Sequence, residues 1–92
     1  MVDEQTCVRQ NDRTAARTLD GKTVVVVLDE RQVHALNELG SMIWQLADGR
    51  SVAGMVDAVM TEYDVERDKA LADVVQFVRE LVALKVLEVT PS

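Results

Sequence analysis

Leu36-Asn37-Glu38-Leu39-Gly40-Ser41-Met42-Ile43-Trp44-Gln45-Leu46, followed closely by Asp48-Gly49, is the stretch of sequence that decides the fold. It turns from a strand-like run into a pattern of apolar residues at helical spacing. Asn37 suits the helix N-cap, because its side-chain oxygen can accept a hydrogen bond from an otherwise unpaired N–H of the first turn. Asp48-Gly49 supplies a stop signal. We therefore predict a short capped helix over about residues 38–47, held in place by the large indole of Trp44.

Strand-like segments precede this helix. Thr14–Leu19 and residues 22–28 are separated by Asp20-Gly21, a pair typical of the type I′ hairpin turn, which needs positive φ at both central positions. The valine-rich second segment has high β propensity and suits a strand that is buried on both faces. Gln32–Leu36 then predicts a third, short antiparallel strand.

Two further helices and a final strand follow. Ser51 can cap a second helix, and a third helix is predicted from about Arg67 to Leu84. Residues 86–89 are short and β-like. The order predicts an α+β fold that is winged helix-turn-helix-like, with an N-terminal three-stranded antiparallel sheet, three helices and a short C-terminal strand. Residues 1–12 show no periodicity and are predicted to be a flexible tail, which leaves residues 13–90 as one domain.

Composition narrows the classes of function. The chain has 92 residues, of which 48% are hydrophobic, so it can bury a modest core as one folded domain. Its net charge of −6 argues against a nucleic-acid partner, since phosphate binding needs a basic face. The acidity suits a protein or peptide partner with basic residues, or it merely aids solubility.

The sequence also bears on location. A single cysteine, Cys7, allows no disulfide within the chain and fits a reducing cytoplasm. The N-terminal residues lack the basic end and apolar core of a signal peptide. The longest apolar run is too short to cross a bilayer. We expect a cytoplasmic protein that does not contact membranes.

No pattern of residues indicates catalysis. His34 has no Cys, Ser or Asp partner at the spacing of a known triad, and there is no Gly-rich phosphate loop. One histidine and one distant cysteine cannot supply the three or four ligands of a zinc site. We expect no enzymatic activity, no metal and no cofactor.

The third helix carries an unusually wide apolar arc. The arc covers roughly half of the helix circumference, whereas an ordinary amphipathic helix needs a stripe of only ~100°. Either the whole arc is internal core, or one flank of it is left over for a ligand. The arc comprises Ala70, Leu71, Val74, Val75, Phe77, Val78, Leu81, Val82 and Leu84.

From about residue 19 to residue 87 the sequence resembles the PqqD-like family, whose members are also called RiPP recognition elements. The shared features are Leu36-Asn37, Gly40, Ile43-Trp44, Leu46, Asp48-Gly49, the helical pattern Asp73-Val74…Phe77…Leu81 and the closing Val86-Leu87. One departure is Lys85, where the family often has glycine before the final strand.

The resemblance implies a non-catalytic peptide chaperone that serves natural product biosynthesis. Such proteins bind the leader segment of a ribosomally synthesised precursor peptide and present it to a modifying enzyme, for example a radical SAM enzyme, or to a leader peptidase. The leader adds as a strand to the third strand and lies in the cleft beside the third helix. A free strand edge supports this mode, because its unpaired N–H and C=O groups can pair with a peptide.

The resemblance also divides the third helix into two sides. Val74, Phe77 and Leu81 match the family pattern and mark the side that faces the core. The expected peptide site combines the edge strand with the other flank of the helix. Its residues are Gln32, Val33, His34, Ala35, Leu36, Leu71, Val75, Val78 and Val82, with Arg79 at the rim.

Two other functions are alternatives. One is a DNA-binding winged helix, which has a similar order of elements but which the net charge opposes. The other is an accessory subunit that only binds and stabilises an enzyme. We expect a monomer, although the same free edge would allow self-association.

Overall fold

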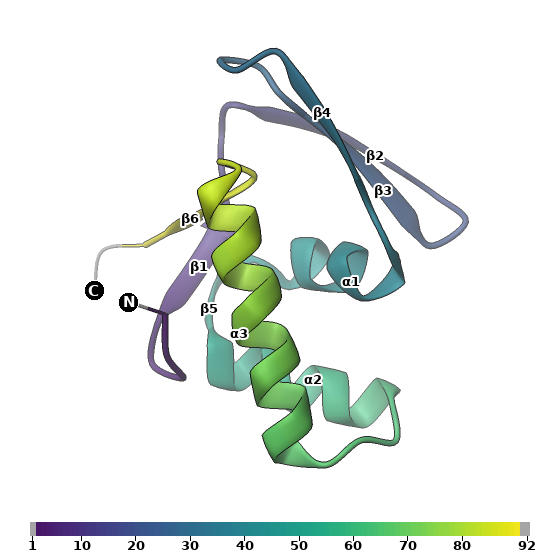
Figure 1. Ribbon diagram of the computed structural model, residues 1–92, viewed down its shortest axis with the longest axis vertical. Helices are drawn as coiled ribbons and strands as arrows, with labels where there is room; N and C mark the ends of the chain where they lie inside the picture. The colour runs from purple at the N-terminus through teal and green to yellow at the C-terminus, as the bar shows by residue number, and fades with distance from the viewer. Residues whose placement is uncertain (1, 91–92) are drawn as a thin grey trace.

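The structure is a computed structural model that describes residues 2–90, and in this part of the chain two small sheets are joined to three helices (Figure 1). The order of the elements confirms the predicted α+β class. The elements are β1 (Cys7–Gln10), β2 (Thr14–Leu19), β3 (Lys22–Val27), β4 (Gln32–Leu36), α1 (Glu38–Leu46), β5 (Asp48–Ser51), α2 (Val52–Glu62), α3 (Arg67–Ala83) and β6 (Leu87–Val89).

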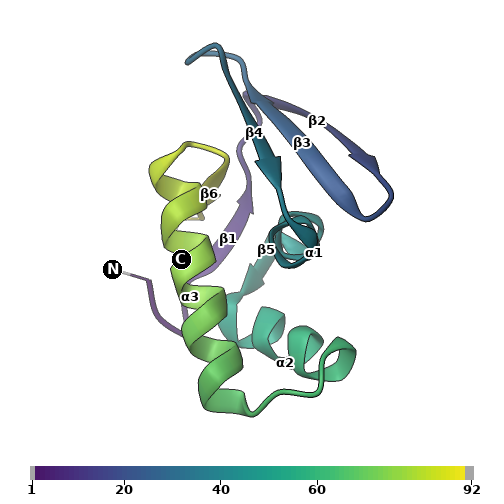
Figure 2. The same ribbon diagram turned by 45° about the vertical axis from the view of Figure 1, so that its right-hand side comes forward.

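The first sheet is antiparallel, with the strand order β2-β3-β4. Asp20 and Gly21 have φ values of 54° and 78°, which confirms the predicted type I′ turn between β2 and β3. Burial alternates along β3: Val25 and Val27 are buried, whereas Val24 is 42% exposed. The expectation that β3 is buried on both faces is therefore wrong, because helices cover only one face of this sheet (Figure 2).

The second sheet has the order β5-β1-β6, so β1 is its central strand. Val8 in β1 is completely buried, and the backbone N–H of Thr90 donates to the carbonyl of Cys7 at 2.9 Å. The prediction of a flexible tail over residues 1–12 is therefore wrong for Cys7–Gln10. The sequence of β1 has almost no hydrophobic pattern, and only one of its four residues is fully buried in the structure.

Helix α1 is fastened to the first sheet by its own polar residues. Asn37 caps the helix as predicted, with its Oδ1 accepting from the N–H of Gly40 at 2.8 Å. The buried hydroxyl of Ser41 accepts from the N–H of Thr23 at 2.7 Å and donates to the carbonyl of Leu36 at 3.4 Å. Trp44 is buried, at 6% exposure, on the core side of the same helix.

The end of α1 leads directly into the second sheet. Asp48-Gly49, expected only to stop the helix, forms the beginning of β5, where Gly49 has a φ of 102°. Gln10 of β1 holds this junction: its N–H donates to the carbonyl of Ala47 at 3.0 Å, and its side-chain amide donates to the carbonyl of Trp44 at 2.8 Å. The N-terminal strand thus supports the segment that contains the tryptophan.

Helix α3 packs against α2, β6 and α1 and ends in a Schellman motif. The N–H of Val86 donates to the carbonyl of Leu81 at 2.9 Å, and the N–H of Lys85 donates to that of Val82 at 3.0 Å. Lys85 has a φ of 65°, a conformation that favours glycine. The departure from the family pattern at this residue therefore leaves the turn geometry intact. Within residues 2–90, no helix has both the length and the apolarity needed to cross a bilayer.

Candidate peptide-binding groove

Strand β4 forms one edge of the first sheet. Among the described residues it pairs only with β3, so alternate backbone groups along its outer side have no strand partner. In Figure 2, β4 lies on the side of the sheet that faces α3. The structure therefore places a free strand edge beside the third helix, as the sequence predicted.

A hollow of about 360 Å³ lies between β4 and α3. The strand contributes four of its five residues, from both faces, and the helix contributes one apolar stripe and a single carboxylate. Its lining residues are Val33, His34, Ala35, Leu36, Asn37, Phe77, Glu80, Leu81 and Leu84. Because most of these side chains are apolar, the hollow suits the apolar side chains of a peptide paired with β4.

The helix face in this hollow differs from the predicted one. Val78 is completely buried in the core. Leu71, Val75 and Val82 are half-buried against the core, Arg79 is exposed, and none of these residues lines the hollow. Within the wide apolar arc, the residues that line the hollow are Phe77, Leu81 and Leu84, and Phe77 is half-buried against the core in the same way as Leu71.

The sequence alone does not fix this face of the helix. A wide apolar arc shows how much of α3 is covered, without showing which neighbour covers each flank. In the structure α3 packs on α2, β6 and α1, and these contacts determine which side of the arc turns towards β4.

The strand residues of the predicted site divide between two positions. Val33, His34, Ala35 and Leu36 line the hollow, whereas Gln32 lies beyond its end with Glu30 and Lys85. The Lys85 ammonium lies 2.6 Å from the Glu30 carboxylate, and this hydrogen bond and charge raise the pKa of Lys85. The exposed ion pair connects the β3–β4 turn to the end of α3 at one end of the groove.

Two details shape the wall of the groove. A Cβ at Gly40 would lie 3.4 Å from Cε1 of Phe77, so glycine allows the aromatic ring to pack closely on α1.

On β4, the Nε2 atom of His34 is buried without a hydrogen-bond partner among the described residues. His34 pairs with the core residue Val25, so its ring points to the inner side of the sheet.

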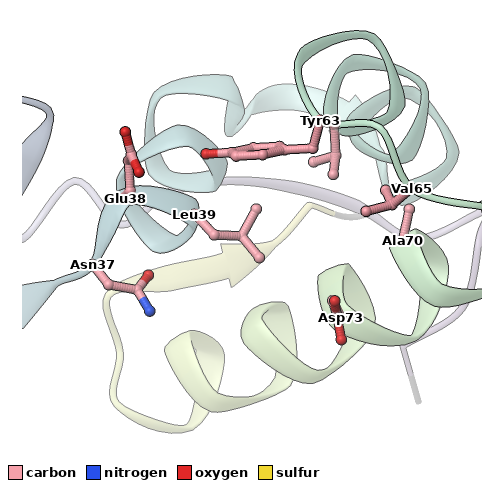
Figure 3. A pocket seen from close by; sticks show the side chains of 8 residues that line it. Asn37, Glu38, Leu39, Tyr63, Val65, Ala70 and Asp73 are labelled. Carbon is pink, nitrogen blue, oxygen red and sulfur yellow. The ribbon is translucent and has the colours of Figure 1, made fainter.

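A second hollow, of about 310 Å³, begins where the first ends. Asn37, the residue after β4, lines both. In Figure 3 the ring of Tyr63 lies over Leu39 with its hydroxyl towards Glu38, and Asp73 lies across the opening on α3. The remaining lining residues are Val59, Val65 and Ala70. This second hollow is apolar inside and has carboxylates at its rim.

Reactive or metal-binding groups are not gathered in either hollow. Within residues 2–90, no group of three His, Cys, Asp or Glu side chains is arranged to hold a metal ion. The free thiol of Cys7 lies on β1, outside both hollows. What the two hollows offer is a strand edge, apolar surface and a few carboxylates, which suits binding of an extended peptide.

The model of the family described as Coenzyme PQQ synthesis protein D (PqqD) matches residues 23–87, well over half of the chain. The chain belongs to the PqqD family. The match spans β3 to β6, so β1 and β2 of this PqqD-family domain precede it.

Two solved structures resemble this PqqD-family domain. "TbiB1 in Complex with the TbiA(beta) Leader Peptide" superposes with a TM-score of 0.83 at 28% identity, over 91% of this chain and 99% of that one. "Lasso peptide synthetase B1 complexed with the leader peptide" has a TM-score of 0.77 at 26% identity, over 88% and 96% of the two chains. No curated protein matches the sequence at a significant level.

Proposed function

We propose that this PqqD-family domain is a non-catalytic peptide chaperone. It binds the leader segment of a ribosomally synthesised precursor peptide by strand addition to β4 and presents that peptide to a modifying enzyme or a leader peptidase. The observation that carries the proposal is the free edge of β4 above an apolar hollow. It is supported by the two similar structures, each of which is a complex with a leader peptide.

Strand addition explains how a short peptide can bind without a deep pocket. Backbone groups of the peptide pair with those that β4 leaves free, and this pairing does not depend on sequence. Every second side chain of the peptide then points towards α3, where Phe77, Leu81 and Leu84 offer apolar contacts. Net affinity comes from these few anchors, because ordering the peptide costs entropy.

The proposed site therefore keeps the strand of the sequence prediction and replaces its helix face. Val33, His34, Ala35 and Leu36 take part on β4, and Phe77, Glu80 and Leu84 replace the flank of Leu71 on α3. We place the protein in the cytoplasm as a monomer. Its proposed enzyme partner is a radical SAM enzyme, a synthetase component or a leader peptidase.

A set of matched leucine variants tests the proposal. Leu84 is 38% exposed and lines the groove, whereas Leu19 is 71% exposed at the far end of the β2–β3 hairpin. We expect Leu84→Ser to weaken binding of the leader at least tenfold, a loss of ~1.4 kcal/mol that the burial of one leucine can supply. Leu19→Ser should bind like the wild type.

The measurement is titration calorimetry with a synthetic leader peptide, taken from a candidate precursor peptide encoded in the same genome. A second leader, N-methylated at alternate backbone positions, tests strand pairing directly, because N-methylation removes the N–H donors that would bind β4. Equal affinity of Leu84→Ser and Leu19→Ser, together with unchanged binding of the methylated leader, would show that the peptide does not use this groove.

A further inference from the structure

The second hollow has the size and lining of an anchor pocket. Its volume of about 310 Å³ is enough for one large apolar side chain, although it lies at the small end of the ~300–1,000 Å³ typical of ligand pockets. Leu39 on α1, Val59 and Tyr63 at the end of α2, and Val65 on the α2–α3 connection form its apolar walls. Tyr63 and Leu39 are only half-buried in the free domain, so their contact surface is available (Figure 3).

The position of this hollow connects it to the groove. Asn37 follows the last residue of β4 directly and lines both hollows. An extended peptide advances ~3.3 Å per residue, so a peptide that continues beyond the end of β4 reaches the second hollow within a few residues. The two hollows therefore form one path along the α3 side of the domain.

The direction of the peptide follows from the sheet. All pairings within the β2-β3-β4 sheet are antiparallel, and antiparallel pairing is slightly the more stable per residue. An antiparallel peptide begins at the Leu36 end of β4 and runs towards Gln32. The residues that pass Asn37 and enter the second hollow are thus those that precede the strand-forming segment.

The carboxylates at the rim of the second hollow favour a positively charged residue in the bound peptide. Glu38 is exposed at the start of α1, and Asp73 lies on α3 across the opening (Figure 3). Asp73 has one cationic neighbour, Lys69, whose Nζ lies 3.4 Å away in an exposed pair. The chain as a whole has a net charge of −6. A lysine or arginine beside the anchor is therefore favoured, whereas a second copy of this acidic rim would be repelled.

We infer that the pocket of Leu39, Val59, Tyr63 and Val65 is a second anchor site for the leader, which receives a large apolar side chain next to a lysine or arginine, both located N-terminal to the strand-forming segment. This inference rests on the proposed function. It adds a rule for the peptide: an apolar-basic pair precedes the segment that pairs with β4.

The test compares two peptides with three leucine variants. The first peptide is the synthetic leader of the candidate precursor peptide, and the second is the same leader shortened to its strand-forming segment. Leu39→Ser should weaken binding of the full leader at least tenfold and leave binding of the shortened leader unchanged. Leu84→Ser, in the groove, should weaken both, and Leu19→Ser should weaken neither. Circular dichroism melts establish that each variant is folded.

A charge exchange provides a second measurement that does not disturb the apolar walls. Glu38→Lys should weaken binding of the full leader, and a leader in which the adjacent basic residue is replaced by glutamate should regain affinity for this variant. This arm remains decisive if Leu39→Ser does not fold, because Glu38 is exposed. Loss of affinity on raising the salt concentration should be steeper for the full leader than for the shortened one.

Each remaining outcome separates the two proposals. If both peptides bind the wild type equally well and Leu39→Ser changes neither, the second anchor does not exist, while the groove stands. If Leu84→Ser affects neither peptide, the proposed function fails at the groove itself. If Leu39→Ser instead converts a dimer into a monomer in sedimentation analysis, the pocket holds a second copy of the chain and the inference is overturned.

Discussion

Ser41 shows how one hydroxyl can set the position of a helix on a sheet. It lies between the N–H of Thr23 on β3 and the carbonyl of Leu36 on β4, and it is buried. Since Leu36 and Thr23 are cross-strand partners, the hydroxyl closes the end of the β3–β4 ladder. The groove side of β4 is therefore held by a residue that does not line the groove.

Replacement of this hydroxyl should lower stability. Ser41→Ala leaves the buried N–H of Thr23 without its acceptor, and we expect a loss of ~1–3 kcal/mol in the free energy of unfolding. The measurement is urea denaturation, with exposed Thr61→Ala as the control. An unchanged unfolding midpoint for Ser41→Ala would mean that another acceptor takes over the Thr23 N–H.

Lys85 combines an unfavourable backbone conformation with a favourable ion pair. Lys85→Gly should raise the melting temperature at neutral pH and moderate salt, because glycine adopts the positive φ without strain and an exposed ion pair contributes little. The pKa of Lys85 is raised by Glu30, so its ion pair stabilises the fold at neutral pH and is lost as the pH rises through that pKa.

The advantage of Lys85→Gly over the wild type should therefore increase at strongly alkaline pH. Thermal melts followed by circular dichroism at neutral and alkaline pH measure both effects. A lower melting temperature for Lys85→Gly at neutral pH would show that the ion pair outweighs the backbone strain.

Among the elements, those with strong local signals follow from the sequence, and those with weak signals do not. The Asn37 cap, the Asp20-Gly21 turn and the long periodic pattern of α3 each carry their structure within a few neighbouring residues. Strands β1 and β5 have four residues each and show no alternation of buried and exposed residues. Only their pairing with segments far away in the chain makes them strands, and a single sequence does not show such pairing.

In the candidate site, only the strand side follows from the sequence. The β4 edge could be predicted because hairpin order places it at the side of the sheet. The face of α3 could not, because a wide apolar arc defines how much surface is buried without defining which neighbour covers each flank. Val78, which was expected in the peptide site, is in the core, and Phe77 packs against the core as expected but also lines the groove.

Strand β1 should be essential for folding despite its polar appearance. Val8→Asp places a charge at a completely buried position between β5 and β6 and should unfold the domain, whereas Arg9→Asp at an exposed neighbouring position should remain folded. Far-UV circular dichroism and hydrogen exchange distinguish the two variants. A folded Val8→Asp with native hydrogen exchange would restore the interpretation of residues 1–12 as a tail.

For the whole molecule, charge separates peptide recognition from the DNA-binding alternative. The chain carries 16 acidic and 10 basic residues, and six of the ten basic side chains form ion pairs with carboxylates, namely Arg9, Arg13, Arg50, Arg67, Lys69 and Lys85. Little positive charge is left to displace counterions from duplex DNA.

We therefore expect no binding to duplex DNA at physiological salt in a fluorescence anisotropy titration, under conditions in which the leader peptide binds. A small random-sequence duplex serves as the probe, and a basic winged-helix protein serves as the positive control. Micromolar DNA affinity that falls steeply with salt would revive the DNA-binding alternative.

The pairing of β1 with β6 has a practical consequence for engineering. Because the N–H of Thr90 donates to the carbonyl of Cys7, the end of β6 lies beside the start of β1, on the opposite side of the molecule from the β2–β3 hairpin (Figure 1). A fluorophore or an affinity handle attached at Thr90 would therefore be close to the start of β1 and distant from the tip of that hairpin.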